Sequence, residues 1–177
     1  MSEIKYKIPI EVTVAYLAAL SLLLSTEWIR LPVWAVFVTW AGFFVLGADK
    51  KAFITIYKCI PLGGVFGLIA VIGFKYLIEA MPFVHWVIPC MIVEFIDVLI
   101  LMIIISKFGF PGGVVFWAFA SYFGTFYGGF FFDLGSYVAN AFSALAWEMI
   151  ANFLGPIFGV LSIKLSLPYI VKKEGGE

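Results

Sequence analysis

The sequence predicts an all-α membrane protein with six transmembrane helices, forming a single polytopic membrane domain over residues 1–177. The first observation is composition, since 64% of the residues are hydrophobic and 12% are charged, whereas soluble domains have about 45–50% apolar and about 25% charged residues. The second is that the apolar residues gather in separate segments, each near the length that a helical span requires. The third is an uneven distribution of lysine and arginine around these segments.

The first two segments are separated by a short polar turn. The first covers residues 10–26 and ends before Glu27 and Arg30. Glu11 interrupts its start and no small-residue cleavage site follows, so we predict a retained helix rather than a cleaved signal peptide. The second segment covers 31–46, and it ends at a stretch that contains Gly47, Asp49 and two lysines.

The remaining segments follow with short breaks that are rich in proline, glycine or charge. Strands of an outer-membrane barrel would alternate in polarity over about ten residues. Stretches such as 17–24 and 98–105 are instead apolar on every side, so we predict helices. The last four predicted spans are 60–78, 82–105, 110–127 and 136–165.

The basic residues predict the orientation of these spans. If the N-terminus is cytoplasmic, all of the 11 basic residues except Arg30 and Lys75 fall on the cytoplasmic side, as the positive-inside rule requires. We therefore predict that both termini are cytoplasmic. Several aromatic residues lie near the proposed outer ends, as in an interfacial belt; they are Trp28, Trp34, Tyr76, Trp86 and Tyr137.

The two halves of the chain resemble each other. A shift of 82 residues aligns 34–47 with 116–129, and a shift of 92 residues aligns 64–68 with 156–160. Two units of three spans each would cross the membrane in opposite directions, which makes an inverted repeat of the kind found in transporters. The alternative is a chance match between helices rich in glycine and phenylalanine.

The same region resembles a known family. The motifs are Trp34 with Trp40-Ala41-Gly42-Phe43-Phe44, Gly63-Gly64, Phe110-Pro111-Gly112-Gly113 and Gly155-Pro156-Ile157-Phe158-Gly159. They resemble the YcdZ-like family of small bacterial inner-membrane proteins, which is built around a domain of unknown function. The resemblance covers about 28–165 and departs at 47–51, where relatives carry a glycine-rich turn. It implies the bacterial cytoplasmic membrane and a compact six-helix unit, but no functional residues.

Three acids are predicted at mid-depth in the membrane. Glu94 and Asp97 lie near the middle of the fourth span, three residues apart and so on one helix face, and Glu148 lies near the middle of the sixth. Each ionisable group at the bilayer centre costs about 2.5–3.5 kcal/mol on insertion scales. The nearest base, Lys75, lies toward a span end where it can pair with Glu79. We expect at least one of the three acids to be protonated at neutral pH, because repulsion and burial both disfavour the charged form.

Five further residues complete the candidate binding site. Asn140 and Asn152 lie at four-residue spacings from Glu148 along the sixth span. Trp40 and Tyr122 are aligned by the internal match, and Trp147 is adjacent to Glu148. Aromatic faces beside acids can hold an organic cation. The alternative for all of these residues is packing or hydrogen bonding between helices.

The favoured function is a small-solute channel or secondary transporter of the cytoplasmic membrane, whose carboxylates bind a proton, a small cation or a small polar solute. The alternative is a non-transporting accessory or scaffold subunit of a membrane complex. We do not expect an enzyme, a cofactor or a metal site, because Cys59 and Cys90 are far apart and His85 is the only histidine. Expected partners are the lipid bilayer, the solute and a second copy in a homo-oligomer. Balanced charges, 11 of each sign, argue against nucleic acid.

Overall fold

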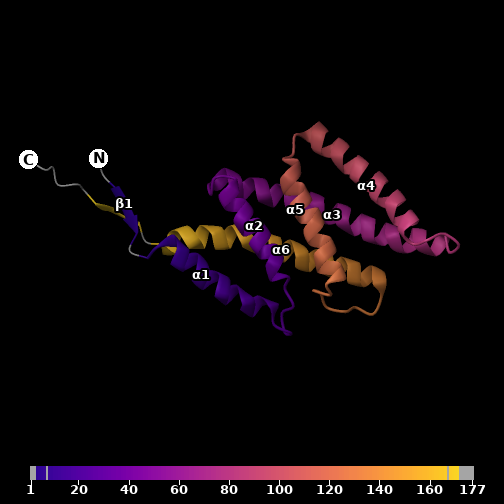
Figure 1. The fold of residues 1–177 in the computed structure, drawn as a ribbon, viewed down its shortest axis with the longest axis horizontal. Coiled ribbons are helices and arrows are strands. Elements are labelled where there is room, and N and C mark those ends of the chain that lie inside the picture. Colours follow the sequence, from indigo (N-terminus) through magenta and orange to yellow (C-terminus); the bar gives the residue numbers. More distant parts are fainter. Residues whose placement is uncertain (1–2, 7, 167, 172–177) are drawn as a thin grey trace, which may run out of the picture.

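The computed structural model describes residues 3–6, 8–166 and 168–171, with side chains described from 8 to 166. This part of the chain forms six α-helices (Figure 1). They are α1 Ile10–Ser21, continued by a 3-10 helix at Leu22–Ser25, α2 Val33–Val45, α3 Lys50–Ala80, α4 Val87–Phe108, α5 Gly112–Tyr127 and α6 Tyr137–Leu165. Each of the six predicted segments therefore overlaps one α-helix, although the bounds differ.

Three of these helices, α3, α4 and α6, are long and apolar enough to cross a membrane. The first helix with its 3-10 continuation (Ile10–Ser25) and α2 are apolar but shorter. The three long apolar helices support a membrane protein. The prediction of six crossings goes beyond these three helices.

The helix boundaries depend on local capping signals. The largest difference from prediction is that α3 begins at Lys50, because the Asp49 side chain accepts a hydrogen bond of 2.7 Å from the amide of Ala52 and caps the helix. At the end of α4, Gly109 adopts a φ of +68° and terminates the helix in the left-handed conformation that glycine favours.

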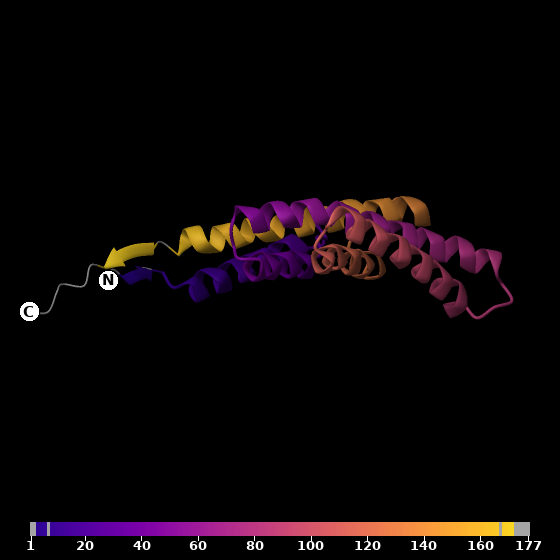
Figure 2. The ribbon, with the colours of Figure 1, turned by 90° about the horizontal axis from the view of Figure 1, so that it is seen from above.

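Two long helices form the axis of the molecule. In Figure 1, α3 and α6 run along its length, and they pack against each other. The shorter helices α1 and α2 pack on α6, whereas α4 and α5 pack on α3. Figure 2 shows α3 and α6 along one side of the bundle and α1, α2 and α5 along the other.

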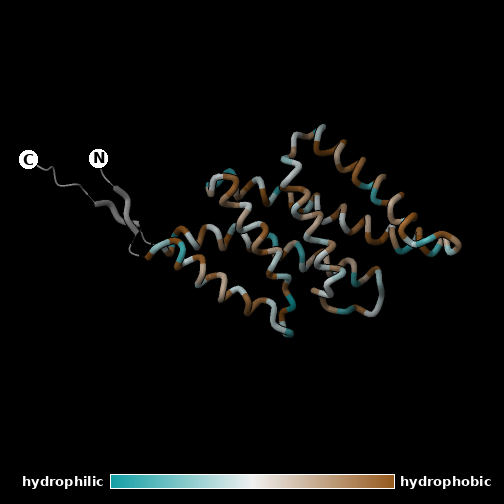
Figure 3. Tube along the Cα trace, viewed as in Figure 1, coloured by the Kyte–Doolittle hydropathy of each residue, from teal (hydrophilic) through white to brown (hydrophobic). Residues whose placement is uncertain are grey.

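The interior lies where α2, α3, α5 and α6 meet. Fully buried side chains from these helices include Val36, Ile56, Val115 and Tyr122. In contrast, α4 lies at the edge and is largely hydrophobic along its length (Figure 3). Many of its apolar side chains, such as Phe95 at 70% exposure, are uncovered, which is typical of a helix that faces lipid or a partner.

A short pair of strands, which the sequence analysis did not predict, joins the two ends of the described chain. Strand β1 (Glu3–Tyr6) pairs antiparallel with β2 (Pro168–Val171), with Glu3 opposite Val171. Because β1 precedes α1 and β2 follows α6, the pairing places the start of α1 and the end of α6 at the same end of the bundle (Figure 1).

Candidate functional site

The three predicted acids lie in two separate places. Glu94 and Asp97 are on α4, which packs along α3, and Glu148 is on α6. Within the part of the chain that the structure describes, α4 and α6 are not one of the extensively packed helix pairs. The acids therefore form one pair and one isolated group.

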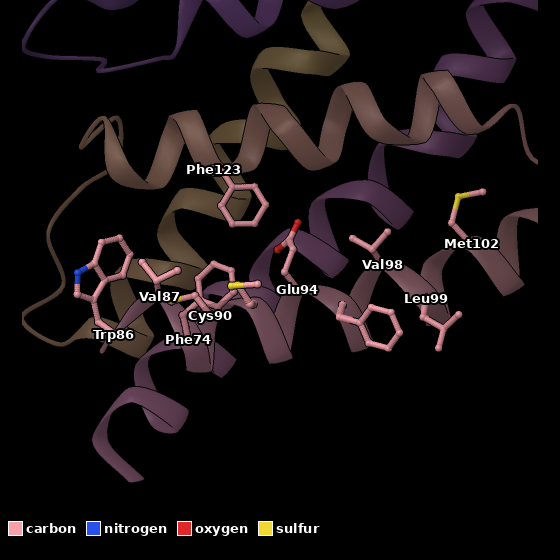
Figure 4. A pocket seen from close by; sticks show the side chains of 11 residues that line it. Phe74, Trp86, Val87, Cys90, Glu94, Val98, Leu99, Met102 and Phe123 are labelled. Carbon is pink, nitrogen blue, oxygen red and sulfur yellow. The ribbon is translucent and has the colours of Figure 1, made fainter. Parts of the chain in front are cut away.

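Glu94 lines a cavity of about 950 Å³ that is bounded by α3, α4 and α5 (Figure 4). We call it the Glu94 cavity. Phe74 of α3 and Phe123 of α5 form two of its walls, and the others come from α4, including Cys90, and from Trp86 just before it. Glu94 is the sole charged side chain among the residues that line it. The Glu94 cavity is thus an apolar, aromatic groove that is open on the side of the exposed Met91 and Phe95 and contains a lone carboxyl group.

Two further cavities continue the Glu94 cavity along α4. One of about 750 Å³ shares Phe74, Trp86 and Cys90 with it and reaches Lys75 and Glu79. Another of about 480 Å³ shares Leu99 and Met102 with it and reaches Ser106 and Lys107. Together they follow most of the length of the helix.

The lysine near this cavity is already neutralised. Lys75 forms an ion pair with Glu79, one helical turn later on α3, as the sequence predicted. The Lys75 ammonium also lies 5.5 Å from the ring centre of Tyr137, within range of a cation–π contact. Among the side chains that the structure describes, none forms an ion pair with Glu94, and one of its carboxyl oxygens, Oε2, is buried without a hydrogen bond.

Asp97 is more deeply buried than Glu94. Its side chain is 4% exposed, and Oδ2 is also buried without a hydrogen-bond partner. Asp97 is not one of the residues that line the Glu94 cavity. A buried polar atom without a partner is unusual and calls for an explanation. On α4 the carboxyl groups of both Glu94 and Asp97 have such an unpartnered oxygen.

Glu148 belongs to an enclosed polar cluster where α2, α3 and α6 meet. It is fully buried, and its Oε1 accepts a hydrogen bond of 2.5 Å from Asn152 Nδ2. Thr39 on α2 donates to the backbone carbonyl of Asn152 at 2.8 Å. The second oxygen, Oε2, lies against Gly64 of α3, 2.7 Å from where a Cβ would stand. Glycine at position 64 therefore makes room for the acid.

The side chains of Asn140 and Trp147 form their hydrogen bonds away from Glu148. The Asn140 side chain accepts a hydrogen bond of 2.7 Å from the amide of Leu134 and donates one of 2.9 Å to Asp133. Hydrogen bonds from the Gly135 amide and, to a smaller extent, from Asn140 lower the pKa of Asp133 below its usual value. Trp147 donates from Nε1 to the carbonyl of Ile29 at 2.8 Å. Both side chains therefore fix a loop, Asn140 the one before α6 and Trp147 the one before α2.

The other two aromatic candidates are buried within the bundle. The Tyr122 hydroxyl donates to the carbonyl of Ala141 at 3.0 Å. Trp40 packs against Phe158, and its Nε1 is buried without a partner. Trp40 also lines a cavity of about 280 Å³ between α1 and α2. Neither residue lines the Glu94 cavity.

The sequence analysis missed most of the residues that surround Glu94. Phe74 comes from α3, Trp86 from the turn before α4 and Phe123 from α5, and hydropathy carries no signal for which helices pack together. The spacing of Cys90, four residues before Glu94, is a signal that could have found it, because it places both residues on the same helix face.

One comparison with known proteins gives a match. The model of a family described as "Protein of unknown function (DUF1097)" matches residues 11–167, which include nearly all of the helical part. No curated protein and no solved structure matches the chain. The matched range contains the region 28–165 that resembles the YcdZ-like family, and that narrower assignment stays a prediction.

Proposed function

We propose that this chain, which belongs to the DUF1097 family of proteins of unknown function, is a channel or secondary transporter for a small cationic solute. The observation that carries the proposal is the Glu94 cavity, where a carboxyl group with an unpartnered oxygen lies in an open apolar groove along a 22-residue apolar helix. Such a group is costly in a membrane and is usually retained for a function.

A cation fits this site better than the other solutes that the sequence left open. The cavity offers a negative charge but few hydrogen-bonding groups for a neutral polar solute. Two carboxylates one helical turn apart would repel each other, and Asp97 is the more deeply buried of the two. We therefore expect Asp97 to retain its proton while Glu94 binds the solute.

Equivalent helix contacts support two inverted repeats. Gly63 on α3 lies against two backbone atoms of α5, a carbonyl oxygen and the amide nitrogen four residues later. Gly155 on α6 lies against the same two atoms of α2. The contacted residues are Val115 and Phe119 in the first case and Val36 and Trp40 in the second.

One turn further, the correspondence continues. Gly67 lies against the ring of Tyr122, and Gly159 lies against the ring of Phe43. These contacts relate α3 to α6 by 92 residues, as the sequence match does, but they relate α2 to α5 by 79 residues rather than 82. The difference of three residues is nearly one helical turn.

The repeats give the Glu94 cavity a smaller counterpart. The cavity of about 280 Å³ between α1 and α2 is lined by Val14, Ala18 and Phe44, and shifts of 79 or 80 residues carry these to Glu94, Val98 and Phe123. Alternating access in inverted-repeat transporters moves one repeat against the other. Two equivalent cavities of unequal volume are expected for one state of such a cycle.

The proposal includes six crossings of the bacterial cytoplasmic membrane with both termini cytoplasmic. Two observations support it: the ends of the helical region lie together at β1 and β2, and six crossings with the N-terminus inside would leave Arg30 and Lys75 as the two basic residues outside.

Flux measurements in proteoliposomes test the proposal. We expect the purified protein to accelerate uptake of at least one of three labelled cations, namely sodium, tetramethylammonium and 1-methyl-4-phenylpyridinium, under a membrane potential that is negative inside. Protein-free vesicles of the same lipid give the background. Uptake equal to that background for all three would contradict the proposal.

The alternative, a non-transporting scaffold subunit, is favoured by the uncovered apolar face of α4. A scaffold would give no flux and would be recovered from native membranes in a stoichiometric complex with another membrane protein. Flux by the purified chain alone would show that the protein is not merely a non-transporting scaffold.

A further inference from the structure

We infer that the Glu94 cavity is a binding site for a lipophilic monovalent organic cation, such as an ammonium or phosphonium ion that carries aromatic or alkyl groups. The inference rests on the proposed function, because it names the substrate class of the same site. Three properties of the cavity lead to it: its charge, its walls and its size.

The negative charge of the cavity favours a ligand with one positive charge. Glu94 is the sole charged group among the residues that line the cavity. In the adjoining cavity Lys75 and Glu79 neutralise each other. An anion would meet an unbalanced carboxylate, and a divalent cation would leave one charge uncompensated in apolar surroundings.

The walls select an organic ion over a metal ion. Aromatic rings reach the cavity from three parts of the chain, namely Phe74 on α3, Trp86 just before α4 and Phe123 on α5. In Figure 4 the Glu94 carboxyl points into the space beside Phe123. Aromatic faces attract organic cations, whereas a small inorganic ion needs several oxygen ligands to replace its water. Among the lining residues a single carboxyl group offers such oxygens.

The size also indicates an organic ligand. A volume of about 950 Å³ is in the upper part of the range of about 300–1,000 Å³ for small-molecule sites. The exposed side chains of Met91 and Phe95 border the cavity, so a lipophilic ligand can enter beside α4 from an apolar surrounding.

The chain contains its own reporter for this site. Cys90 lines the cavity one helical turn before Glu94 (Figure 4). The other cysteine, Cys59, is 1% exposed. A thiol reagent is therefore expected to report on the cavity through Cys90, and Cys90→Ser identifies any labelling elsewhere.

The test compares two methanethiosulfonate reagents of similar size, one ending in trimethylammonium and the other in sulfonate. Each forms a mixed disulfide with Cys90 and releases methanesulfinate. After division by their rates with a free thiol in solution, we expect the cationic reagent to react about tenfold faster with the detergent-purified protein, because of the nearby carboxylate. Glu94→Gln should bring the ratio close to one. Glu27→Gln removes an exposed carboxyl group outside the cavity and should leave the ratio unchanged.

Ligand protection on the unmodified protein gives a second measurement that needs no variant. Tetraphenylphosphonium should slow modification of Cys90, and tetraphenylborate, which has the same shape and the opposite charge, should not. Equal protection by both ions, or by neither, would overturn the inference.

The outcomes separate the inference from the proposed function. Flux of sodium or tetramethylammonium without protection by tetraphenylphosphonium would overturn the substrate class and leave the proposed function. Protection by tetraphenylphosphonium without flux of any tested cation would overturn the proposed function and leave the binding site.

Discussion

Replacing Gly155 with alanine is expected to lower the free energy of unfolding by about 3 kcal/mol, the upper end of the usual cost of overpacking. The added methyl group would overlap Thr39 Oγ1 and stand 2.6 Å from both the Trp40 amide nitrogen and the Val36 carbonyl oxygen. Backbone atoms cannot rotate away as a side chain can, so α2 and α6 would have to separate.

Thermal unfolding in detergent measures this effect. For a chain of this size the expected loss corresponds to a fall in Tm of about 6–12 °C. Gly63→Ala should give a similar fall, because its methyl group meets the equivalent backbone atoms of α5. Gly113→Ala is the matched control, since beyond its chain neighbours and its own helix backbone nothing lies within 4 Å of the added group, and at this exposed position in the first turn of α5 it should change the free energy of unfolding by no more than about 0.5 kcal/mol. Equal Tm values for all three variants would contradict the packing described.

Replacing Glu94 with glutamine is expected to reduce flux of the transported cation at least about tenfold, the effect of losing one charge interaction in a partly apolar site. Glutamine preserves the size of the side chain but removes its negative charge and replaces one acceptor oxygen with an NH2 donor. Proteoliposomes with equal amounts of wild-type or variant protein provide the measurement.

The control for this prediction is Glu27→Gln. Glu27 is exposed in the turn between the 3-10 helix and α2, so its loss should leave flux within twofold of the wild type (a difference of about 0.4 kcal/mol). A similar reduction in both variants would indicate a general effect of surface charge. Full flux in Glu94→Gln would show that the cation does not depend on this carboxyl group.

Hydropathy was sufficient to place all six helices but not their ends. It detects the apolar part of a helix, whereas α3 continues ten residues before that part through Lys50 and Lys51 to the cap at Asp49. The pairing of β1 with β2 joins residues more than 160 positions apart, and short segments of this kind carry no local signal of their partner.

The candidate site was predicted in part. Glu94 and Asp97 were found because acids are rare in apolar helices, and both have an unpartnered buried oxygen. Trp147 was chosen for its adjacency to Glu148, but neighbouring residues on a helix point about 100° apart, and its indole reaches Ile29 instead.

Depth along a helix does not reveal which helices meet. Glu94 and Glu148 were both predicted at mid-depth, yet one lines an open cavity and the other is enclosed against Gly64. Similarly, the sequence match between α2 and α5 was one turn out of register with the contacts that these helices make, because several glycine and aromatic residues recur at helical spacing.

The most direct test of the Glu94 cavity is to locate a bound cation. Crystals of the protein grown with tetraphenylarsonium, whose arsenic atom scatters anomalously, should show one strong anomalous peak among α3, α4 and α5, beside Glu94 and Phe123. The same peak should be absent in Glu94→Gln. A peak elsewhere, or an equal peak in the variant, would contradict the assignment of this cavity as the cation site.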